Sequence, residues 1–518
     1  MSTKTDIEWA VERVMQAYSG PGGACAVLRN GETLARHTWG WANAERRIAW
    51  TPKTRARICS ITKQFTCAAL LSEFEDPSSL DQMVEHRLPL LEVPAPSVMH
   101  LCHNQSGLRD YWAVAMLHGA LAESVVGEAE AARVIGTTRT LHFPPGSCYS
   151  YSNQNFRILS DIIQERSGRS FDELLRKNIF SVAGMSDAML VPYTLAMPDW
   201  AEGYEGAQET GFWPARNHIF WTGDAGIAAS LDDMIAWEKY IDDTRDDPDS
   251  IYRRLSSDVE FTDGKPAAYG FGLSRRSILG REATSHNGAL RGWRSYRAYL
   301  PSERLSVVVM FNHHSDAIAA GLDLFAAALG VEAPNYSEKP NKLDWSGSFI
   351  DGQTGLVARI DPVAGGRARL RYGHSPEFLH LEADGALSSD TVRLRRDEGG
   401  ISMDRSYENL NTVLHTCDGA ARHDVVGRYL CGELNSEVSI VDTGGALYGG
   451  FSGFLGQGRM EMLSPVGPDI WTMPCRRALD HAPPGDWTLV FGRDPAGRAE
   501  SVEVGCWLAR RLPYMRAD

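Results

Sequence analysis

The sequence predicts an α+β protein in which one antiparallel sheet, flanked by helices, precedes two small antiparallel β-barrel domains. Two observations support this fold class. Helical and strand-like apolar patterns frame residues 5–330, and the remaining third of the chain alternates apolar and polar residues between Gly-rich turns. A chain of 518 residues is also too long for one compact core. We therefore predict domains at residues 1–332, 343–417 and 424–518.

The first elements are a helix and a β-hairpin. Apolar residues recur at helical spacing near the N-terminus, at Ile7, Val11, Val14, Met15 and Tyr18. The Gly-Pro-Gly-Gly segment at residues 20–23 ends this helix. Residues 24–28 and 33–41 then read as two strands joined by the turn Asn30-Gly31, a pair that favours tight hairpins.

Strand signals return only after a long stretch of helical and loop segments. They occur at residues 268–274, 288–299 and 305–311, and residues 316–329 form a closing amphipathic helix. Two early and three late strands, with helices at both ends, predict one antiparallel sheet with a helical insertion.

After residue 329 the composition changes. Residues 334–342 are polar and marked by prolines, as expected of a linker, and no lysine follows Lys342. Residues 345–349 resemble residues 425–429, and a Gly-Gly pair follows each segment, at 365–366 and at 444–445. This spacing predicts two all-β domains of similar design.

Composition excludes several kinds of partner. The net charge of −14, the pI of about 5.6 and the absence of a basic run argue against nucleic acid and anionic membranes. The N-terminus lacks an apolar signal sequence, and no apolar stretch approaches 18 residues. Nine cysteines without a CxxC pair favour a reduced, cytoplasmic location and no metal site.

The first candidate catalytic pair is Ser60 and Lys63. Residues three apart share one face of a helix, and the segment from Ser60 to Phe74 suits a helix. A serine hydroxyl needs a base, and a buried lysine can lose its proton near neutral pH. Lys63 is the only lysine that lies three residues after a serine. Taken alone, this spacing fits an ordinary surface lysine better.

Two further motifs favour a catalytic Lys63 over a surface lysine. A Pro-Gly turn precedes Tyr151 and Asn153, a phenol that can relay protons and an amide that can hold a substrate carbonyl. His286 and Gly288 lie where a strand is expected to begin. Gly288 lets a substrate approach the backbone, and the N–H of Ala289 could join that of Ser60 in an oxyanion hole. Each motif alone also fits a structural role, as a polar loop or as a hydrogen-bonding histidine.

Together, the three motifs resemble the signatures of the penicillin-recognising serine hydrolases, which include class C β-lactamases, D,D-peptidases and related esterases. Other segments are similar to that family in the same order: 104–108, 149–153, 183–185, 226–234 and 269–272. The resemblance covers about residues 5–330. It implies a β-lactamase-like fold and an acyl-enzyme on Ser60, with Lys63 as the base and Tyr151 as the proton relay.

The chain departs from most members of that family at the third motif, where His286 replaces a lysine. In the family this lysine helps to bind a substrate carboxylate, which a neutral imidazole attracts far less. His286 with two appended β-domains resembles the three-domain aminopeptidases of the family that act on D-amino acids. In those proteins a loop of the last domain supplies an acid to the substrate amine. Residues 476–485 resemble that loop and make Asp480 the candidate anchor.

We therefore expect a cytoplasmic serine hydrolase that releases N-terminal D-amino acids from small peptides, amides and esters. The expected catalytic residues are Ser60, Lys63, Tyr151 and His286, and the expected substrate-binding residues are Asn153, Ala289 and Asp480. No metal or organic cofactor is expected, and the family resemblance makes a homodimer plausible. Two alternatives stay open: a carboxylesterase, β-lactamase or D,D-peptidase on the same fold, and a non-catalytic sensor or scaffold.

Overall fold

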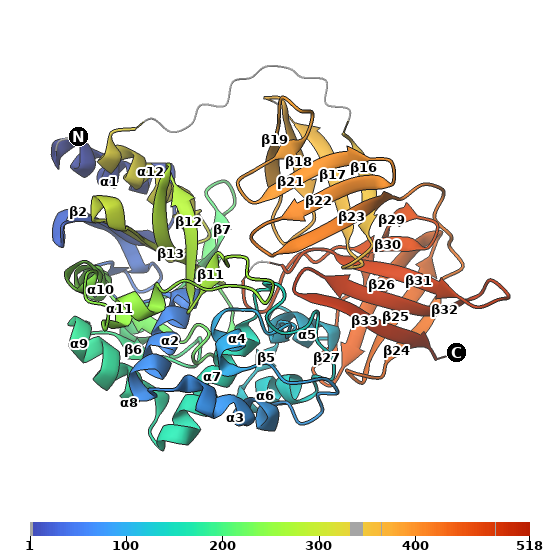
Figure 1. The fold of residues 1–518 in the computed structure, drawn as a ribbon, viewed down its shortest axis with the longest axis horizontal. Coiled ribbons are helices and arrows are strands. Elements are labelled where there is room, and N and C mark those ends of the chain that lie inside the picture. Colours follow the sequence, from blue (N-terminus) through green and yellow to red (C-terminus); the bar gives the residue numbers. More distant parts are fainter. Residues whose placement is uncertain (1–3, 332–344, 364, 482, 518) are drawn as a thin grey trace.

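The computed structural model describes residues 4–331, 345–363, 365–481 and 483–517. Figure 1 shows a helix-rich part that carries the N-terminus, next to two β-rich parts that end at the C-terminus. The linker predicted at residues 334–342 lies outside the described residues.

The first part is built on an eight-stranded antiparallel sheet. Its strand order is β11-β12-β13-β14-β15-β1-β2-β3, so the N-terminal hairpin joins the C-terminal strands through β1 and β15. The strands are β1 Gly22–Arg29, β2 Glu32–Asn43, β3 Ile48–Ala49, β11 Tyr269–Gly270, β12 Leu273–Ile278, β13 Arg281–Leu290, β14 Trp293–Leu300 and β15 Leu305–Phe311. The single antiparallel sheet predicted from the two clusters of strand signals is present.

One of the predicted strands is in fact a hairpin. Residues 288–299 do not form one strand, because the chain turns at Arg291 and Gly292, where Gly292 has φ +80°. Strand β13 begins at Arg281, so His286 and Gly288 lie in its second half and not at its start.

Helices cover both faces of the sheet. On one face, α1 (Lys4–Ala17) and α12 (Ala317–Leu329) bury Ile7, Val11 and Leu324 against strand residues that include Val27 and Val307. Asp316 caps α12 by accepting hydrogen bonds from two backbone N–H groups. The other face packs against α2 (Thr62–Glu73) and α10 (Leu231–Thr244). The predicted opening and closing helices are thus confirmed.

The predicted helical insertion lies between β3 and β11 and also contains short strands. Its further helices are α3 Asp81–Arg87, α4 Val98–Cys102, α5 Tyr111–Leu117, α6 Glu128–Gly136, α7 Asn153–Ser167, α8 Phe171–Leu175, α9 Ser181–Ala183 and α11 Ile251–Leu255. Its short strands are β4 Ala56–Arg57, β5 Val125–Val126, β6 Met189–Leu190, β7 Tyr204–Ala207, β8 Gly211–Pro214, β9 His218–Ile219 and β10 Ile227–Ala229. These two- to four-residue strands are too short to show periodicity in the sequence.

The middle part of the chain is a closed antiparallel barrel. Its strands are β16 Gly347–Asp351, β17 Val357–Val363, β18 Arg367–Arg371, β19 Glu377–Leu381, β20 Leu387–Ser388, β21 Val392–Asp397, β22 Gly400–Arg405 and β23 Leu410–Thr416. The Gly-Gly pair at residues 365–366 makes the turn between β17 and β18, as predicted.

The last part is a ten-stranded antiparallel sheet whose pairings do not close into a ring among the described residues. Its strands are β24 Gly427–Cys431, β25 Ser436–Thr443, β26 Ala446–Gly453, β27 Gly456–Gln457, β28 Glu461–Met462, β29 Ser464–Gly467, β30 Ile470–Met473, β31 Trp487–Arg493, β32 Ala499–Cys506 and β33 Ala509–Arg516. Strands β24–β26 repeat the arrangement of β16–β18, with the second Gly-Gly turn at residues 444–445. The α+β class is confirmed, whereas the exact domain boundaries stay predictions.

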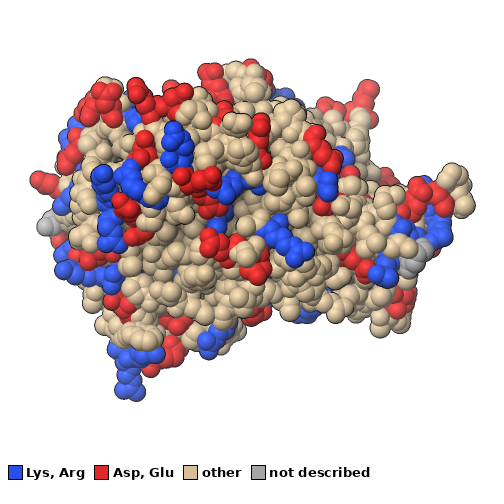
Figure 2. Space-filling model, turned by 90° about the horizontal axis from the view of Figure 1, so that it is seen from below, with Lys and Arg blue, Asp and Glu red and all other residues tan. Residues whose placement is uncertain are grey.

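Acidic and basic side chains are interspersed over the face drawn in Figure 2, with no large area of a single sign. Within the described ranges, no helix is both long and apolar enough to cross a membrane.

Candidate active site

Ser60 lies where the chain enters α2. A short 3-10 turn, Cys59–Ile61, precedes the helix, which itself begins at Thr62 and not at Ser60. Cys59 has φ +53°, a left-handed conformation that is unusual for a residue with a side chain. Such strained positions gather at functional sites, where packing holds them. The turn places the Ser60 hydroxyl within hydrogen-bonding distance of two candidate residues.

Those two residues are Lys63 and Tyr151. Lys63 Nζ lies 3.0 Å from Ser60 Oγ, and the Tyr151 hydroxyl donates to the same oxygen at 2.7 Å. Tyr151 comes from the loop before α7, 91 residues away along the chain. The structure thus brings together the nucleophile, base and proton relay that the motifs predicted, although their catalytic roles stay predictions.

Lys63 is fully buried. Its ammonium donates to Asn153 Oδ1 at 2.8 Å and to the backbone oxygen of Asp224 at 2.7 Å. Burial lowers the pKa of Lys63 to about 8, although the negative charges of Asp224, Asp110 and Asp480 act in the opposite direction. A lysine with this pKa is partly neutral in mildly alkaline solution, so it can accept the Ser60 proton.

Asn153 orients Lys63 through hydrogen bonds on both sides of its side-chain amide. Its side-chain amide donates to Asp110 Oδ2 at 2.9 Å, and its backbone N–H donates to the same oxygen at 2.7 Å. With its carbonyl oxygen bonded to Lys63, Asn153 links Asp110 to the base. The substrate contact predicted for Asn153 stays a prediction, with one amide hydrogen left to make it.

His286 is buried and neutral. Burial lowers its pKa to about 3, and the charge of Lys63 acts in the same direction. Nδ1 lies 2.6 Å from the backbone oxygen of Asn287, which can only accept, so Nδ1 carries the proton. Nε2 then accepts from the Tyr269 hydroxyl at 3.1 Å. Among the described residues, this tyrosine and not Tyr151 or Ser60 is the side-chain partner of His286.

The strand that carries His286 passes close to the nucleophile. A Cβ added to Gly288 would lie 2.4 Å from the backbone oxygen of Ile58 and 2.8 Å from Cys59 Cβ, so only glycine fits. Strand β12 pairs with β13 no further than Ser285, so within the described ranges the following edge of β13 has no strand partner. Ala289 lies on this segment, and its part in an oxyanion hole stays a prediction.

Asp480 reaches this site from the last β-domain. Two backbone contacts hold its loop on the catalytic part: Asn217 Nδ2 donates to Leu479 O at 2.6 Å, and Arg291 N donates to Asp480 O at 2.7 Å. The Asp480 side chain is buried, and this burial together with the Asp110 carboxylate raises its pKa to about 7. The Asp480 charge in turn raises the pKa values of Lys63 and Tyr151.

Sequence reasoning missed Asp110 and Asp224. Asp110 holds Asn153, and Asp224 bonds Lys63 through its backbone and Tyr111 through its carboxylate, at 2.6 Å. Both follow or adjoin segments that were singled out for family resemblance, at 104–108 and 226–234. That proximity was the only signal, because a single buried aspartate has no sequence pattern of its own.

The last β-domain also binds the segment that contains Asp110 through hydrogen bonds and an ion pair. Leu508 O accepts from Asp110 N at 2.9 Å, and Arg510 O accepts from Arg109 Nε at 3.0 Å. Glu433 Oε1 accepts from Arg109 at 3.1 Å, and both side chains are at most 8% exposed. The active site is therefore built against this domain at Asp110 as well as at Asp480.

Replacing Glu433 with glutamine is expected to lower the free energy of unfolding by about 3 kcal/mol, because the substitution leaves the Arg109 guanidinium buried without its counter-charge. Urea denaturation measures this loss. Glu437→Gln is the matched control: it breaks the exposed pair with Arg428, which is worth less than about 1 kcal/mol. Equal losses of unfolding free energy in the two variants would contradict a stabilising role for the buried Arg109–Glu433 ion pair.

Comparisons with known proteins agree with this geometry. Residues 8–330 match the family described as Beta-lactamase, and residues 338–515 match D-aminopeptidase, domain B. The chain is 55% identical over 520 residues to a D-aminopeptidase of Gluconobacter oxydans, covering 98% of both chains. It is 47% identical over 510 residues to a D-aminopeptidase of Brucella canis, again covering 98% of both.

The chain belongs to the D-aminopeptidase family. The predicted resemblance to penicillin-recognising serine hydrolases is confirmed by the β-lactamase match and by the fold. An octameric penicillin-binding protein homologue from Pyrococcus abyssi superposes with a TM-score of 0.54 at 21% identity, over 88% of this chain and 99% of its own. A D-amino acid amidase from Ochrobactrum anthropi, complexed with D-phenylalanine, superposes with a TM-score of 0.51 at 19% identity. The superposition covers 63% of this chain and 98% of the amidase chain.

Proposed function

We propose that this protein is a serine hydrolase that releases N-terminal D-amino acids from small peptides, amides and esters through an acyl-enzyme. The observation that carries the proposal is a Ser60 hydroxyl shared by Lys63 and Tyr151, with a buried Asp480 carboxylate whose charge raises the pKa of both. The D-aminopeptidases of Gluconobacter and Brucella, similar over nearly their whole length, support the same substrate class.

In the proposed reaction, neutral Lys63 takes the Ser60 proton while Oγ forms a bond to the scissile carbonyl carbon. Burial raises the pKa of Tyr151 well above its ordinary value, so its phenol stays protonated and can donate to the departing nitrogen. The C–N bond then breaks, and Tyr151 recovers a proton from the Lys63 ammonium. Water then attacks the acyl carbonyl while Lys63 takes its proton, the bond from the carbonyl carbon to Ser60 Oγ breaks, and Oγ recovers the proton from Lys63 as the amino acid leaves.

Asp480 is proposed to bind the substrate ammonium. A buried carboxylate loses hydration, and a cation in the same space restores favourable charge interactions. We also propose that its loop occupies the space where longer N-terminal extensions of a substrate would lie, which would limit release to one residue at a time.

Turnover of D-alanine amide against L-alanine amide tests the proposal, with Ser60→Ala as the inactive reference. Nitrocefin and p-nitrophenyl butyrate test the two alternative hydrolase activities in the same assay. If only the butyrate ester reacts, the protein is a carboxylesterase. If no substrate reacts and a fluorophosphonate does not label folded protein, the site is a scaffold.

The rate is expected to fall as the pH drops from about 8 to 6. Lys63 must lose a proton, with a pKa of about 8, and Asp480 must be ionised, with a pKa of about 7. Both requirements fail at low pH, so log kcat/KM should acquire a slope of up to two on the acid side. Asp480→Asn should remove one of the two ionisations. It should also shift the remaining one to lower pH, because Asp480 raises the pKa of Lys63. A flat profile between pH 6 and 8 would contradict these assignments.

A cytoplasmic location and a homodimer belong to the same proposal. All nine cysteines are free, as expected of a reducing compartment. Light scattering on the purified protein tests the homodimer, and the mass of a monomer or of a larger assembly would contradict it.

A further inference from the structure

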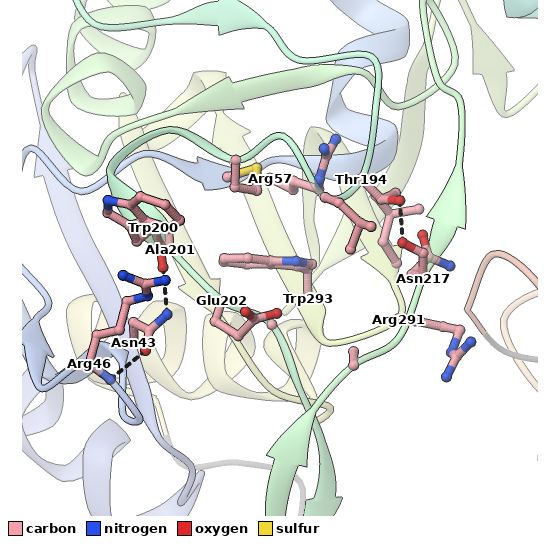
Figure 3. Close-up of a pocket in the computed structure, with 15 residues that line it drawn as sticks. Asn43, Arg46, Arg57, Thr194, Trp200, Ala201, Glu202, Asn217, Arg291 and Trp293 are labelled. Carbon is pink, nitrogen blue, oxygen red and sulfur yellow. Dashed lines mark hydrogen bonds between the residues drawn. The ribbon is translucent and has the colours of Figure 1, made fainter. Parts of the chain in front are cut away.

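A cavity of about 200 Å³ has a lining that does not include Ser60, and Figure 3 shows the residues around it. It lies between the end of the β13–β14 hairpin and the segments near residues 194–203 and 215–217. The lining residues that matter here are Arg57, Glu202, Asn217, Leu290 and Trp293. Ser60, Lys63, Tyr151, Asn153, Ala289 and Asp480 do not line it.

Two buried polar atoms at this cavity lack hydrogen-bond partners among the described residues. They are Arg57 Nε, a donor, and Asn217 Oδ1, an acceptor, on side chains of residues that are 1% and 5% exposed. Buried polar groups are nearly always paired, and a ligand atom of the opposite kind would pair with each of these two atoms by displacing the wall atoms that now cover it.

Arg57 is a buried cation without a counter-ion in the described part of the chain. Its terminal nitrogens donate to the backbone oxygens of Val191 and Tyr193, at 3.0 and 2.6 Å, and no carboxylate lies within ion-pair distance. Burial lowers its pKa to about 10, so it stays protonated at neutral pH. An uncompensated buried charge is costly, and a carboxylate ligand would offset that cost.

The rest of the cavity wall carries the cations Arg46 and Arg291, the carboxylate of Glu202 and apolar surface. Glu202 is half-buried and forms no ion pair with the described residues, and burial raises the pKa of its carboxyl group, with Glu45 adding to the rise. Leu290 and Trp293 provide buried apolar wall. Figure 3 shows Glu202, Asn217 and Trp293 arranged around the same space.

We propose that this cavity binds a free α-amino acid with an apolar side chain, the product class of the proposed function on which this inference rests. The carboxylate pairs with Arg57, the ammonium with Asn217 Oδ1 and Glu202, and the side chain contacts Leu290 and Trp293. The volume of about 200 Å³ suits one amino acid better than a peptide.

Two hydrogen bonds connect the cavity to the amine anchor. Asn217 and Arg291 both line the cavity, and their donor groups hold the backbone oxygens of Leu479 and Asp480. A ligand that engages Asn217 Oδ1 therefore acts on the loop that carries Asp480. Released amino acid is expected to inhibit in a mixed manner, raising KM and lowering kcat, and not by competition alone.

Calorimetry on Ser60→Ala with D-leucine tests the second site, because this variant cannot turn over substrate analogues. We expect two D-leucine molecules per chain. D-Leucine amide and N-acetyl-D-leucine each lack one charged group and should not occupy the cavity. Ala215→Leu fills the cavity from its buried wall and should leave one site. Glu202→Gln should weaken the second site about tenfold, and Glu209→Gln, an exposed neighbour outside the cavity, should not.

One D-leucine per chain in both Ser60→Ala and its Ala215→Leu derivative would overturn the inference, and so would a D-leucine-soaked crystal with only water beside Arg57. Failure of the proposed function has a different signature. In that case wild-type protein would not hydrolyse D-alanine amide, while the Ala215-sensitive D-leucine site would still be measured.

Discussion

Replacing Lys63 with methionine is expected to lower kcat for D-alanine amide by at least about a thousandfold. Ser60 would then have no group to accept its proton, because its other partner, Tyr151, keeps its phenol protonated. Methionine nearly preserves the volume of the buried lysine, so the effect on packing is small. Steady-state kinetics measures the loss, and circular dichroism verifies the fold.

Lys177→Met is the matched control, since this lysine is exposed and lies outside the site. It should leave kcat unchanged. Fluorophosphonate labelling adds a second readout, because Ser60 should react much more slowly in the Lys63 variant. A kcat within tenfold of wild type would show that another group takes the Ser60 proton.

Local sequence patterns predicted the parts of the site that depend on short spacing. The three-residue interval between Ser60 and Lys63 gives their contact on any helix-like turn, and the structure places them 3.0 Å apart. The pattern could not reveal the 3-10 turn at residues 59–61, because a 3-10 turn and the start of an α-helix bring residues three apart together similarly.

The contacts that the sequence did not reveal join distant segments. Lys63 is held by Asn153 and Asp224, 90 and 161 residues away, and Asp110 acts on Asn153 from 43 residues away. His286 hydrogen-bonds Tyr269 on β11, a contact that no sequence pattern indicated, and its catalytic role stays a prediction. Such pairings follow from sheet order and loop packing, which periodicity does not encode.

The appended domains have a physical role that their composition did not predict. Family resemblance identified Asp480, but the contacts of Glu433, Leu508 and Arg510 with residues 109 and 110 have no sequence signal. The last β-domain thus contacts Asp110 and contains Asp480, and the charges of both aspartates raise the pKa of Lys63. In the proposed reaction, recognition of the amine and tuning of the base are therefore coupled through this domain.

Replacing Asp480 with asparagine is expected to lower kcat/KM for D-alanine amide by about a hundredfold or more, mainly through KM. The substitution keeps the shape of the side chain and removes the only property that a substrate ammonium needs, a negative charge in a buried position. Substrates without an ammonium measure the rest of the site, so hydrolysis of p-nitrophenyl butyrate should change by less than about threefold.

A thermodynamic cycle separates this anchor from a general disturbance of the loop. N-Acetylation of D-alanine amide removes the same charge pair from the other side, so the Asp480→Asn change should have little further effect on the acetylated substrate. Asp486→Asn alters an exposed carboxylate of the same loop and should leave KM unchanged. If Asp480→Asn lowers kcat with KM intact, the carboxylate acts on the proton relay of Lys63 and Tyr151, and the amine is held elsewhere. If Asp480→Asn raises KM for D-alanine amide but not for its N-acetyl derivative, the effect depends on the substrate ammonium. That result requires the ammonium and the Asp480 carboxylate to interact in the complex.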